Sequence, residues 1–312
     1  KVIAVVKANA YGVSALHVCK VLGDIEEVSS YAVACVEEGI ELRKAGIKKD
    51  ILILGGVLKG EEKALVEYGL TPVVSHKEHL RAIEGLSIGF HVKYDTGMGR
   101  LGFIGEVIKD SRIKGVLTHL SSPLDREYSI RQVEEFRKIV SHYENVDIHV
   151  ESSAGVIYKV PFATHVRIGL ALYGEKPVPH YPINLQRALS LKARLISVKT
   201  LPAGFSVSYS RTYITDKPKK VGVVAFGYAD GLPKSLSNLA NLYWNGKPVK
   251  ILGSITMDMT MVDLDNTDAK VGDWIEIVGE NQSFGDLASL AKTIPYEIMC
   301  NMSSRIERVV IE

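Results

Sequence analysis

A lysine near the start of the chain has the surroundings that covalent carbonyl chemistry requires. Lys7 directly follows the apolar run Ala4-Val5-Val6, and Val2–Val6 has the composition of a buried β-strand. A lysine at the end of such a strand is poorly solvated, which lowers the pKa of its amine and lets it form a Schiff base with an aldehyde cofactor. The alternative is a lysine whose ammonium group extends from the strand end into water. Position alone leaves both interpretations open.

Further polar side chains stand where other apolar runs end. They are Arg100, His119, Ser152 and Ser153, and Arg167, with Gly169, lies on the last run. In a barrel of parallel strands the C-terminal strand ends share one rim, and that rim carries the active site. The loops after the last two strands commonly bind phosphate, which Ser153 and the backbone of Gly169 and Leu170 would suit. One such residue means little, but five on one rim favour a site.

Two other patterns resemble binding sites, and we interpret both as incidental. Gly97–Gly102 matches the glycine fingerprint of dinucleotide-binding folds, with Asp125 near the expected downstream spacing. It follows the fifth predicted strand and does not open a first βαβ unit, which argues against a nicotinamide cofactor. His76 and His79 have helical spacing without a carboxylate ligand pattern, so we predict a solvated helix face and no metal site.

Apolar, β-branched runs alternate with amphipathic or charged segments through the first half of the chain. Continuous apolar runs separated by helices are typical of a parallel sheet. Eight runs predict a closed (β/α)₈ barrel of the TIM type in preference to an open sheet. The predicted strands are Val2–Val6, Tyr31–Val36, Ile51–Leu54, Leu70–Ser75, Ile88–Asp95, Lys114–Leu120, Asp147–Ser152 and Thr164–Leu170. The predicted helices include Glu37–Ala45, Glu61–Tyr68, Lys77–Ile83, Phe103–Lys109, Ser129–Tyr143 and Val156–Val160.

The character of the sequence changes near Pro182–Gln186. From Leu189 onward, short β-rich segments are separated by turn signals, which is typical of an all-β domain. We therefore predict two domains, a barrel over residues 1–185 and a smaller, mostly β C-terminal domain over residues 186–312.

Composition narrows the class of protein. The chain has 312 residues, 46% of them hydrophobic, which is enough for a barrel and a second domain. A net charge of +2 with well-mixed signs gives no footprint for nucleic acid or an acidic membrane surface. The three cysteines lack metal-ligand spacing, so we expect reduced, buried thiols in a cytoplasmic protein with no membrane partner. The chain begins at Lys1 without methionine, and we expect an N-terminal piece to be missing.

The motifs together resemble those of the alanine racemase family. Ala4–Gly12 is similar to the cofactor-lysine motif of that family. The other signatures follow in the family's order, as Asp95–Arg100, Arg167–Gly169 with Tyr173-Gly174, Val207–Tyr209, Gly227–Gly231 and Met257-Asp258. They extend over nearly the whole chain and both predicted domains, so the set is far more specific than any single motif.

The resemblance implies pyridoxal 5'-phosphate (PLP) as cofactor. Lys7 would hold it as a Schiff base, and Arg167 would face its pyridine nitrogen. Arg100 would contact a cofactor oxygen and the substrate carboxylate, and His119 would lie near the cofactor ring. The phosphate would be held by Tyr11, Ser153, Gly169 and Leu170.

The resemblance also implies two bases on opposite faces of one carbon. Lys7 would act on the D-isomer and Tyr209, from the partner subunit of a homodimer, on the L-isomer. Met257, also from the partner, would bind the substrate carboxylate through its backbone. Lys93 matches a position that is often a carbamylated lysine, and Tyr228 would support the site. Free tyrosine has a pKa near 10, so Tyr209 needs nearby positive charge or hydrogen-bond donors.

Three positions depart from the family pattern. Ser304 stands where many members have a second active-site tyrosine, four residues after Cys300, and it would lie beside the cofactor. Ser254 and Lys234 stand where many have arginines lining the substrate entrance. These departures affect substrate preference and access, while the catalytic set is intact.

Three alternatives remain at this stage. A serine-type or broad-specificity amino-acid racemase is the nearest, because Ser304 changes a position at the site. A small barrel protein that binds PLP without turnover would lack the second domain with Tyr209 and Met257. A purely structural barrel would make the rim residues a coincidence.

Overall fold

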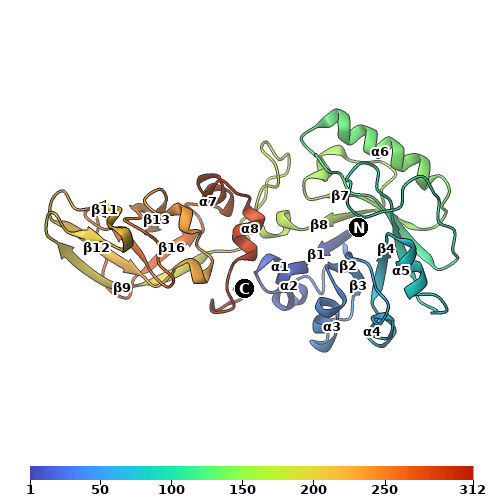
Figure 1. Ribbon diagram of the computed structural model, residues 1–312, viewed down its shortest axis with the longest axis horizontal. Helices are drawn as coiled ribbons and strands as arrows, with labels where there is room; N and C mark the ends of the chain where they lie inside the picture. The colour runs from blue at the N-terminus through green and yellow to red at the C-terminus, as the bar shows by residue number, and fades with distance from the viewer. Residues whose placement is uncertain (312) are drawn as a thin grey trace. The chain divides into compact units, whose positions relative to one another are not determined.

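The computed structural model describes residues 1–311, which form two compact units (Figure 1). The first unit consists of Lys1–Leu172 and Lys176–Asn184. The second consists of Tyr173–Glu175 and the chain from Leu185 onward. The predicted domain division, between residues 185 and 186, falls beside the last of these junctions.

The first unit is built on a closed barrel of eight parallel strands in sequence order, with β1 pairing with both β2 and β8. The strands are β1 Val2–Val5, β2 Val28–Val33, β3 Asp50–Ile53, β4 Thr71–Val74, β5 Phe90–Lys93, β6 Ile113–Leu117, β7 Asp147–Ser152 and β8 His165–Ile168. Most of their residues are buried, and β5 is buried along its whole length, as a strand covered on both faces must be. The predicted (β/α)₈ barrel is confirmed.

Helices connect most of the barrel strands, and Figure 1 shows α3, α4 and α5 outside the strands that they join. Their bounds are α1 Lys7–Tyr11, α2 Ala15–Val21, α3 Val36–Lys44, α4 Glu62–Glu67, α5 Lys77–Ala82 and α6 Arg126–Val140, with 3₁₀ helices η1 Gly155–Tyr158 and η2 Leu170–Tyr173. No helix of residues 1–311 has the length and apolar character needed to cross a bilayer.

The predicted helix Phe103–Lys109 is wrong. The segment between β5 and β6 is a loop, tied to the end of β5 where Phe103 N donates to Lys93 O at 2.9 Å and Asp95 N donates to Phe103 O at 3.1 Å. Gly105 then takes a positive φ of 71°, which breaks helical geometry. The glycine-rich run Gly97–Gly102 lies in this same loop and opens no helix, which removes the structural context that a dinucleotide site needs.

The second unit is β-rich, as predicted. Its strands are β9 Leu191–Leu201, β10 Ser206–Val207, β11 Tyr213–Ile214, β12 Lys219–Val224, β13 Asn241–Trp244, β14 Lys247–Lys250, β15 Thr260–Asp263 and β16 Trp274–Val278. Six form an antiparallel sheet in the order β14-β13-β16-β9-β12-β15, and β10 pairs with β11. Apolar side chains of Leu201, Val207, Val221 and Leu252 form a core.

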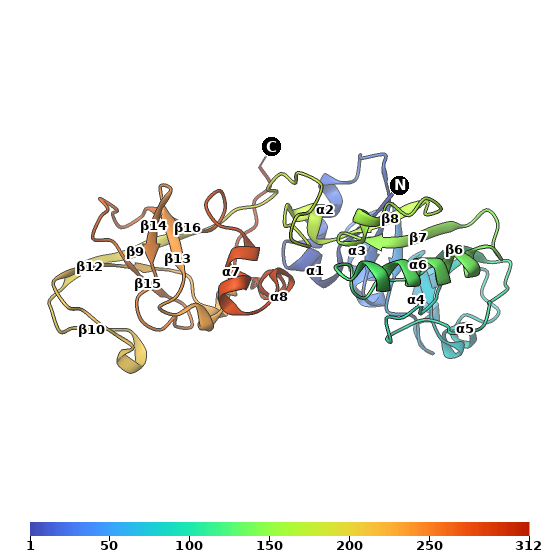
Figure 2. The same cartoon turned by 90° about the horizontal axis from the view of Figure 1, so that it is seen from above.

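Short helices complete this unit. They are η3 Tyr209–Arg211, η4 Tyr228–Asp230, η5 Lys234–Leu236, α7 Phe284–Ala291 and α8 Pro295–Cys300. Ser283 and Asp286 form a capping box at the start of α7, which satisfies backbone amides there. Figure 2 shows α7 and α8 side by side.

Two burial predictions need correction. His76 is exposed, as predicted, but His79 is only 8% exposed. Its ring packs where a Cβ on Gly56 would otherwise lie, and its Nδ1 accepts from Ser75 N at 3.3 Å. Among the cysteines only Cys19 is buried, whereas Cys35 and Cys300 lie at exposed helix ends. Within residues 1–311 no three His, Cys, Asp or Glu side chains are grouped so as to hold a metal ion.

Candidate active site

Lys7 lies just beyond the C-terminal end of β1 and directly precedes a left-handed turn. The four residues after it, Ala8–Tyr11, all have φ between 51° and 57°, although none is glycine. This conformation costs an L-residue about 1–2 kcal/mol, so other contacts must hold the turn. Ala10 N donates to Val6 O at 2.8 Å and Gly12 N to Ala8 O at 2.9 Å. Strained backbone of this kind concentrates at functional sites.

The end of this turn meets the last two strands of the barrel. Gly169 follows β8 so closely against Tyr11 that a Cβ there would overlap Tyr11 Oη. Ser153, buried at the end of β7, accepts at Oγ from the backbone N–H groups of Gly169 (2.9 Å) and Ala171 (3.3 Å). Leu170, the first residue of η2, comes between Gly169 and Ala171 in the sequence, and its side chain is fully buried. Two hydroxyl groups therefore converge on a backbone corner that only glycine allows, and such a cradle fits a phosphate.

Arg167 is the most heavily bonded side chain of the barrel interior. Its Nη2 donates to the carbonyl oxygens of Thr118 (2.7 Å) and Val150 (2.9 Å) and to Nδ1 of His119 (3.2 Å). Its Nη1 donates to the backbone oxygen and to Nδ1 of His149, at 2.7 and 2.8 Å. Burial lowers the pKa of Arg167 to about 10, which leaves the guanidinium positively charged at neutral pH. The group is fixed from several sides, which preorganises its positive charge to bind a ligand.

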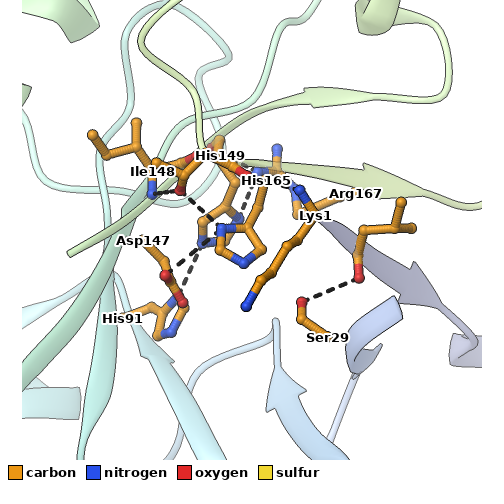
Figure 3. A network of polar contacts seen from close by, with 10 residues as sticks. Lys1, Ser29, His91, Asp147, Ile148, His149, His165 and Arg167 are labelled. Atoms are coloured by element: carbon orange, nitrogen blue, oxygen red, sulfur yellow. Dashed lines mark hydrogen bonds and ion pairs between the residues drawn. The ribbon is translucent and has the colours of Figure 1, made fainter. Parts of the chain in front are cut away.

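Two histidines continue the network beneath Arg167 (Figure 3). An arginine only donates, so the Nδ1 atom of His149 must accept and its proton must sit on Nε2. That Nε2–H then donates to His91 Nδ1 at 2.9 Å. Burial is the larger cause and neighbouring positive charge the smaller one. Together they lower the pKa of His91 to about 3 and that of His149 well below its usual value. Both rings are therefore neutral supports for Arg167.

His119 is also neutral, and the same reasoning fixes its tautomer. Burial and the charge of Arg167, followed by Lys93, Arg100 and Lys7, lower its pKa to about 3. Its Nδ1 accepts from Arg167, so the proton lies on Nε2. His119 thus presents an N–H donor on the far side of its ring.

Asp95 shapes the loop that carries Arg100. Its carboxylate accepts from the backbone N–H groups of Gly97, Met98, Gly99 and Arg100 at 2.7–3.1 Å. Burial alone would raise the pKa of Asp95, but these four amide bonds lower it. Lys93, two residues earlier, is 6% exposed. Burial and the charges of Arg100 and Arg167 lower the pKa of Lys93 to about 8.

The barrel rim is therefore a cluster of positive charge. The positive charges of Arg100, Arg167 and Lys7 lower the pKa of Lys93, and those of all four residues lower the pKa of His119. Burial also keeps His119 neutral, so it adds no fifth positive charge. Such a cluster repels itself unless an anion is present. A phosphate and a carboxylate are the ligands that it fits, and the Tyr11–Gly169–Ser153 cradle supplies uncharged donors beside it.

The remaining predicted residues belong to the second unit. Tyr209 begins η3 and is 72% exposed, and the backbone around it is strained, with positive φ at Ser208, Ser210 and Arg211. Ser254 is buried and donates from Oγ to Tyr209 O at 3.2 Å, while Ser208 Oγ donates to Ser254 O at 2.5 Å. In this unit Ser254 supports the turn that presents Tyr209.

Met257 and Tyr228 lie on adjoining loops. Tyr228 N donates to Thr256 O at 3.0 Å and Ala229 N to Met257 O at 2.9 Å, and a Cβ on Gly227 would overlap the Met257 carbonyl. Arg305 joins the two loops by ion pairs to Asp230 (3.0 Å) and Asp258 (2.8 Å). Lys234, in η5, and Ser304 are exposed.

The structure thus brings Lys7, Tyr11, Lys93, Arg100, His119, Ser153, Arg167, Gly169 and Leu170 to the barrel unit and Tyr209, Tyr228, Met257 and Ser304 to the second unit. His91 and His149 carry no sequence-based prediction, and Asp95 is predicted only as part of the signature Asp95–Arg100 without a role of its own. Asp95 precedes a glycine-rich run, which is a turn signal. The two histidines interrupt apolar strand runs, which signals buried polar groups.

The chain is similar to known proteins over its whole length. The chain matches the family models "Alanine racemase, N-terminal domain" over residues 1–177 and "Alanine racemase, C-terminal domain" over residues 188–310. It is 62% identical to an alanine racemase of Aquifex aeolicus, over all of this chain and 92% of that protein.

Solved structures of alanine racemases have the same fold as this chain. Alanine racemase from E. faecalis superimposes with a TM-score of 0.90 at 33% identity, covering 98% of this chain and 90% of that one. Alanine racemase from Bartonella henselae, with covalently bound PLP, superimposes with a TM-score of 0.89 at 27% identity, covering 100% and 92%. The chain belongs to the alanine racemase family of isomerases, whose cofactor is PLP.

Proposed function

We propose that this protein interconverts L-alanine and D-alanine with PLP attached to Lys7. The observation that carries the proposal is the cationic cluster of Lys7, Arg100 and Arg167 on the same barrel rim as the Tyr11–Gly169–Ser153 cradle. The reaction would take place in the cytoplasm and supply D-alanine for cell-wall synthesis.

Each rim residue has a role toward the cofactor under this proposal. Lys7 would bind the aldehyde carbon through Nζ, and Arg167 would face the pyridine nitrogen. Arg100 would bind a cofactor oxygen and the substrate carboxylate. The phosphate would be held by Tyr11, Ser153, Gly169 and Leu170. When bound, PLP withdraws electrons from the α carbon of the amino acid and so makes its α proton acidic.

Arg167 limits how far that electron withdrawal goes. A guanidinium that donates to five acceptors in a buried network does not give up a proton at neutral pH. It would therefore leave the pyridine nitrogen largely unprotonated, which weakens the electron sink. This disfavours transamination, which needs a longer-lived carbanion.

Racemisation moves protons on two faces of one carbon. From the L-isomer, the phenolate oxygen of the partner subunit's Tyr209 would remove the α proton, while the Lys7 ammonium would deliver a proton to the opposite face and give the D-isomer. The reverse reaction exchanges the roles. His119, with its Nε2–H donor, would orient and stabilise the phenolate.

A partner subunit is part of the proposal because the second unit exposes its candidate site residues to solvent. Tyr209, Tyr228 and Met257 are all more than two-fifths exposed, which is unusual for large apolar groups gathered on adjoining loops. A two-fold homodimer would cover them and complete each barrel site with the partner's Tyr209 and the backbone of the partner's Met257.

Lys93 would support the substrate-binding arginine as a carbamate. Its pKa of about 8 leaves part of the amine neutral near physiological pH, and a neutral amine adds to CO₂ with release of one proton. The resulting negative charge would face Arg100. Labelled bicarbonate should give a carbamate carbon signal in the wild type and none in Lys93→Arg, and a signal in both would contradict the assignment.

The decisive test is to mix purified protein and PLP with L-alanine or with L-serine and to follow chirality. Loss of optical activity with L-alanine is expected, and none with either amino acid would overturn the proposal. A broad or serine-type racemase is the second candidate, favoured by the small, exposed Ser304. Faster loss of chirality with L-serine than with L-alanine would establish it.

A further inference from the structure

The carboxylate of Glu38 joins the ends of two neighbouring barrel strands. Glu38 lies in the first turn of α3 and is half-buried. Its Oε1 accepts from Ala8 N at 2.6 Å, and its Oε2 accepts from Ala34 N at 2.7 Å. Ala8 follows Lys7, and Ala34 follows β2, which pairs with β1. Both bonds are short and charge-assisted, so they are stronger than ordinary neutral hydrogen bonds.

The bond to Ala8 fixes the first residue of the left-handed turn. Ala8 through Tyr11 hold positive φ without a glycine, so the turn depends on contacts from outside it. Ala15 N donates to Asn9 Oδ1 at 2.9 Å at the far side, and Glu38 holds the near side. Lys7 precedes this turn and Tyr11 ends it, so its geometry sets where the amine and the phenol of these two residues lie.

We propose that Glu38 is a positioning residue of the PLP site, which holds the Ala8 turn so that Lys7 and Tyr11 engage the aldehyde and the phosphate of one cofactor molecule. This inference rests on the proposed function, in which those two residues bind PLP. Glu38 would act through the Ala8 turn and would itself contact neither cofactor nor substrate.

The chemistry explains why a carboxylate is needed. Two backbone N–H groups must each find an acceptor, and a carboxylate offers one oxygen to each. A glutamine offers one oxygen and one NH₂ group, so one backbone amide would face another donor. An aspartate is one methylene shorter and cannot span both amides from the same helix position.

The test compares Glu38→Gln with Glu41→Gln, a matched change one helical turn away at an exposed position. Each holoenzyme is diluted into PLP-free buffer with an aldehyde scavenger, and cofactor release is followed by absorbance. Loss of one charge-assisted bond should speed release about tenfold in Glu38→Gln, with no change in Glu41→Gln. Hydrogen exchange of the peptide that contains Ala8 should quicken in Glu38→Gln alone.

Three outcomes overturn the inference. PLP release at the wild-type rate does so, even where Ala8 exchange quickens, because the contact would then not position the cofactor. Equal acceleration in Glu41→Gln would indicate a general effect of lost charge on α3. A fall in melting temperature that accounts for the faster release would make Glu38 a structural residue only.

A separate experiment tests the proposed function independently of the role of Glu38. Borohydride reduction of wild-type holoenzyme and peptide mapping should place the cofactor on Lys7. A label elsewhere overturns the proposed function, whereas a label on Lys7 with unchanged release in Glu38→Gln overturns only the role of Glu38.

Discussion

Three functional side chains of the barrel rim are buried, whereas those on the loops of the second unit are exposed. On the rim, Arg167, Lys93 and Ser153 are less than 7% exposed and are fixed by neighbouring strands. In the second unit, Tyr209 is 72% and Met257 53% exposed, although their backbones are well held. The first region is organised within one chain, as the proposed binding of an anionic cofactor requires. The second is organised to offer side chains to something outside its own fold, which supports the proposed dimer.

The largest effect should come from the rim. Lys7→Ala should lower racemase activity below detection, because no other amine lies at the end of β1 to bind PLP covalently. Borohydride reduction and peptide mapping of the variant should find no labelled peptide. A label on Lys93 or Lys234 in the wild type would break the assignment of the cofactor to the rim lysine.

The two regions can be tested together with mixed dimers. Lys7→Ala and Tyr209→Ala chains, each inactive alone, should recover about a quarter of wild-type activity after co-refolding, since half of randomly assorted dimers are mixed and each has one intact site. Heterodimers can be verified with two different affinity tags. If verified heterodimers stay inactive, both bases come from one chain and the proposed division of labour is wrong.

Substitution of Tyr209 alone should slow proton exchange on one face of the α carbon. Tyr209→Ala should slow exchange of the α proton of L-alanine by about 10²–10⁴ and retain part of the exchange of D-alanine, which depends on Lys7. Deuterium incorporation from D₂O measures both. Equal loss for the two isomers would point to a structural defect, and Tyr243→Phe, in β13, provides a control elsewhere in the second unit.

Acid should weaken the barrel more than the second unit. Every histidine lies at or before residue 180. His91 and His119 have pKa values of about 3 in the fold, against about 6.5 when unfolded. Their contribution to stability is complete above pH 6.5 and is lost as pH falls toward 3, because the unfolded chain then binds more protons. The pKa values of His149, His79 and His165 are also lowered, so the slope should reach at least about three protons per chain.

Two probes separate the regions in urea unfolding. Absorbance of bound PLP reports the barrel, and tryptophan fluorescence reports the second unit, which contains Trp244 and Trp274. The PLP midpoint should fall from pH 7 to pH 5 more than the fluorescence midpoint does. His91→Gln should make the dependence shallower, and a pH-independent PLP midpoint would contradict neutral, buried histidines.

The smallest expected effect concerns selectivity. Ser304→Tyr should reduce turnover of amino acids larger than alanine by roughly threefold to tenfold more than turnover of alanine, because it restores a bulky side chain. The measurement is kcat/KM for alanine and serine in both proteins. A parallel fall for the two substrates would remove Ser304 from the determinants of specificity.

Many of the rim residues could be predicted from the sequence, because consecutive strands of a parallel barrel lie side by side and point in the same direction. Lys7, Arg100, His119 and Ser153 follow four different strands and Arg167 lies on β8, and closure puts all C-terminal strand ends on one side. The loop after β5 was predicted wrongly as helical over Phe103–Lys109, because its pairing with the end of β5 is a tertiary contact. His79 was expected to be solvated, and its burial depends on space left by the distant Gly56.

Local periodicity and motifs along the chain are enough to predict the order of strands, the change to a β-rich second unit and the residue types at the rim. The left-handed turn after Lys7 depends on tertiary contacts, because it contains no glycine to signal it and is held by Glu38 from thirty residues away. The tertiary structure also decided the neutral state of His119 and His149, since burial and a shared bond to Arg167 exist only after strands β6, β7 and β8 have come together. A pattern along the chain records which residues can do chemistry, whereas pKa and backbone strain depend on which distant groups surround them.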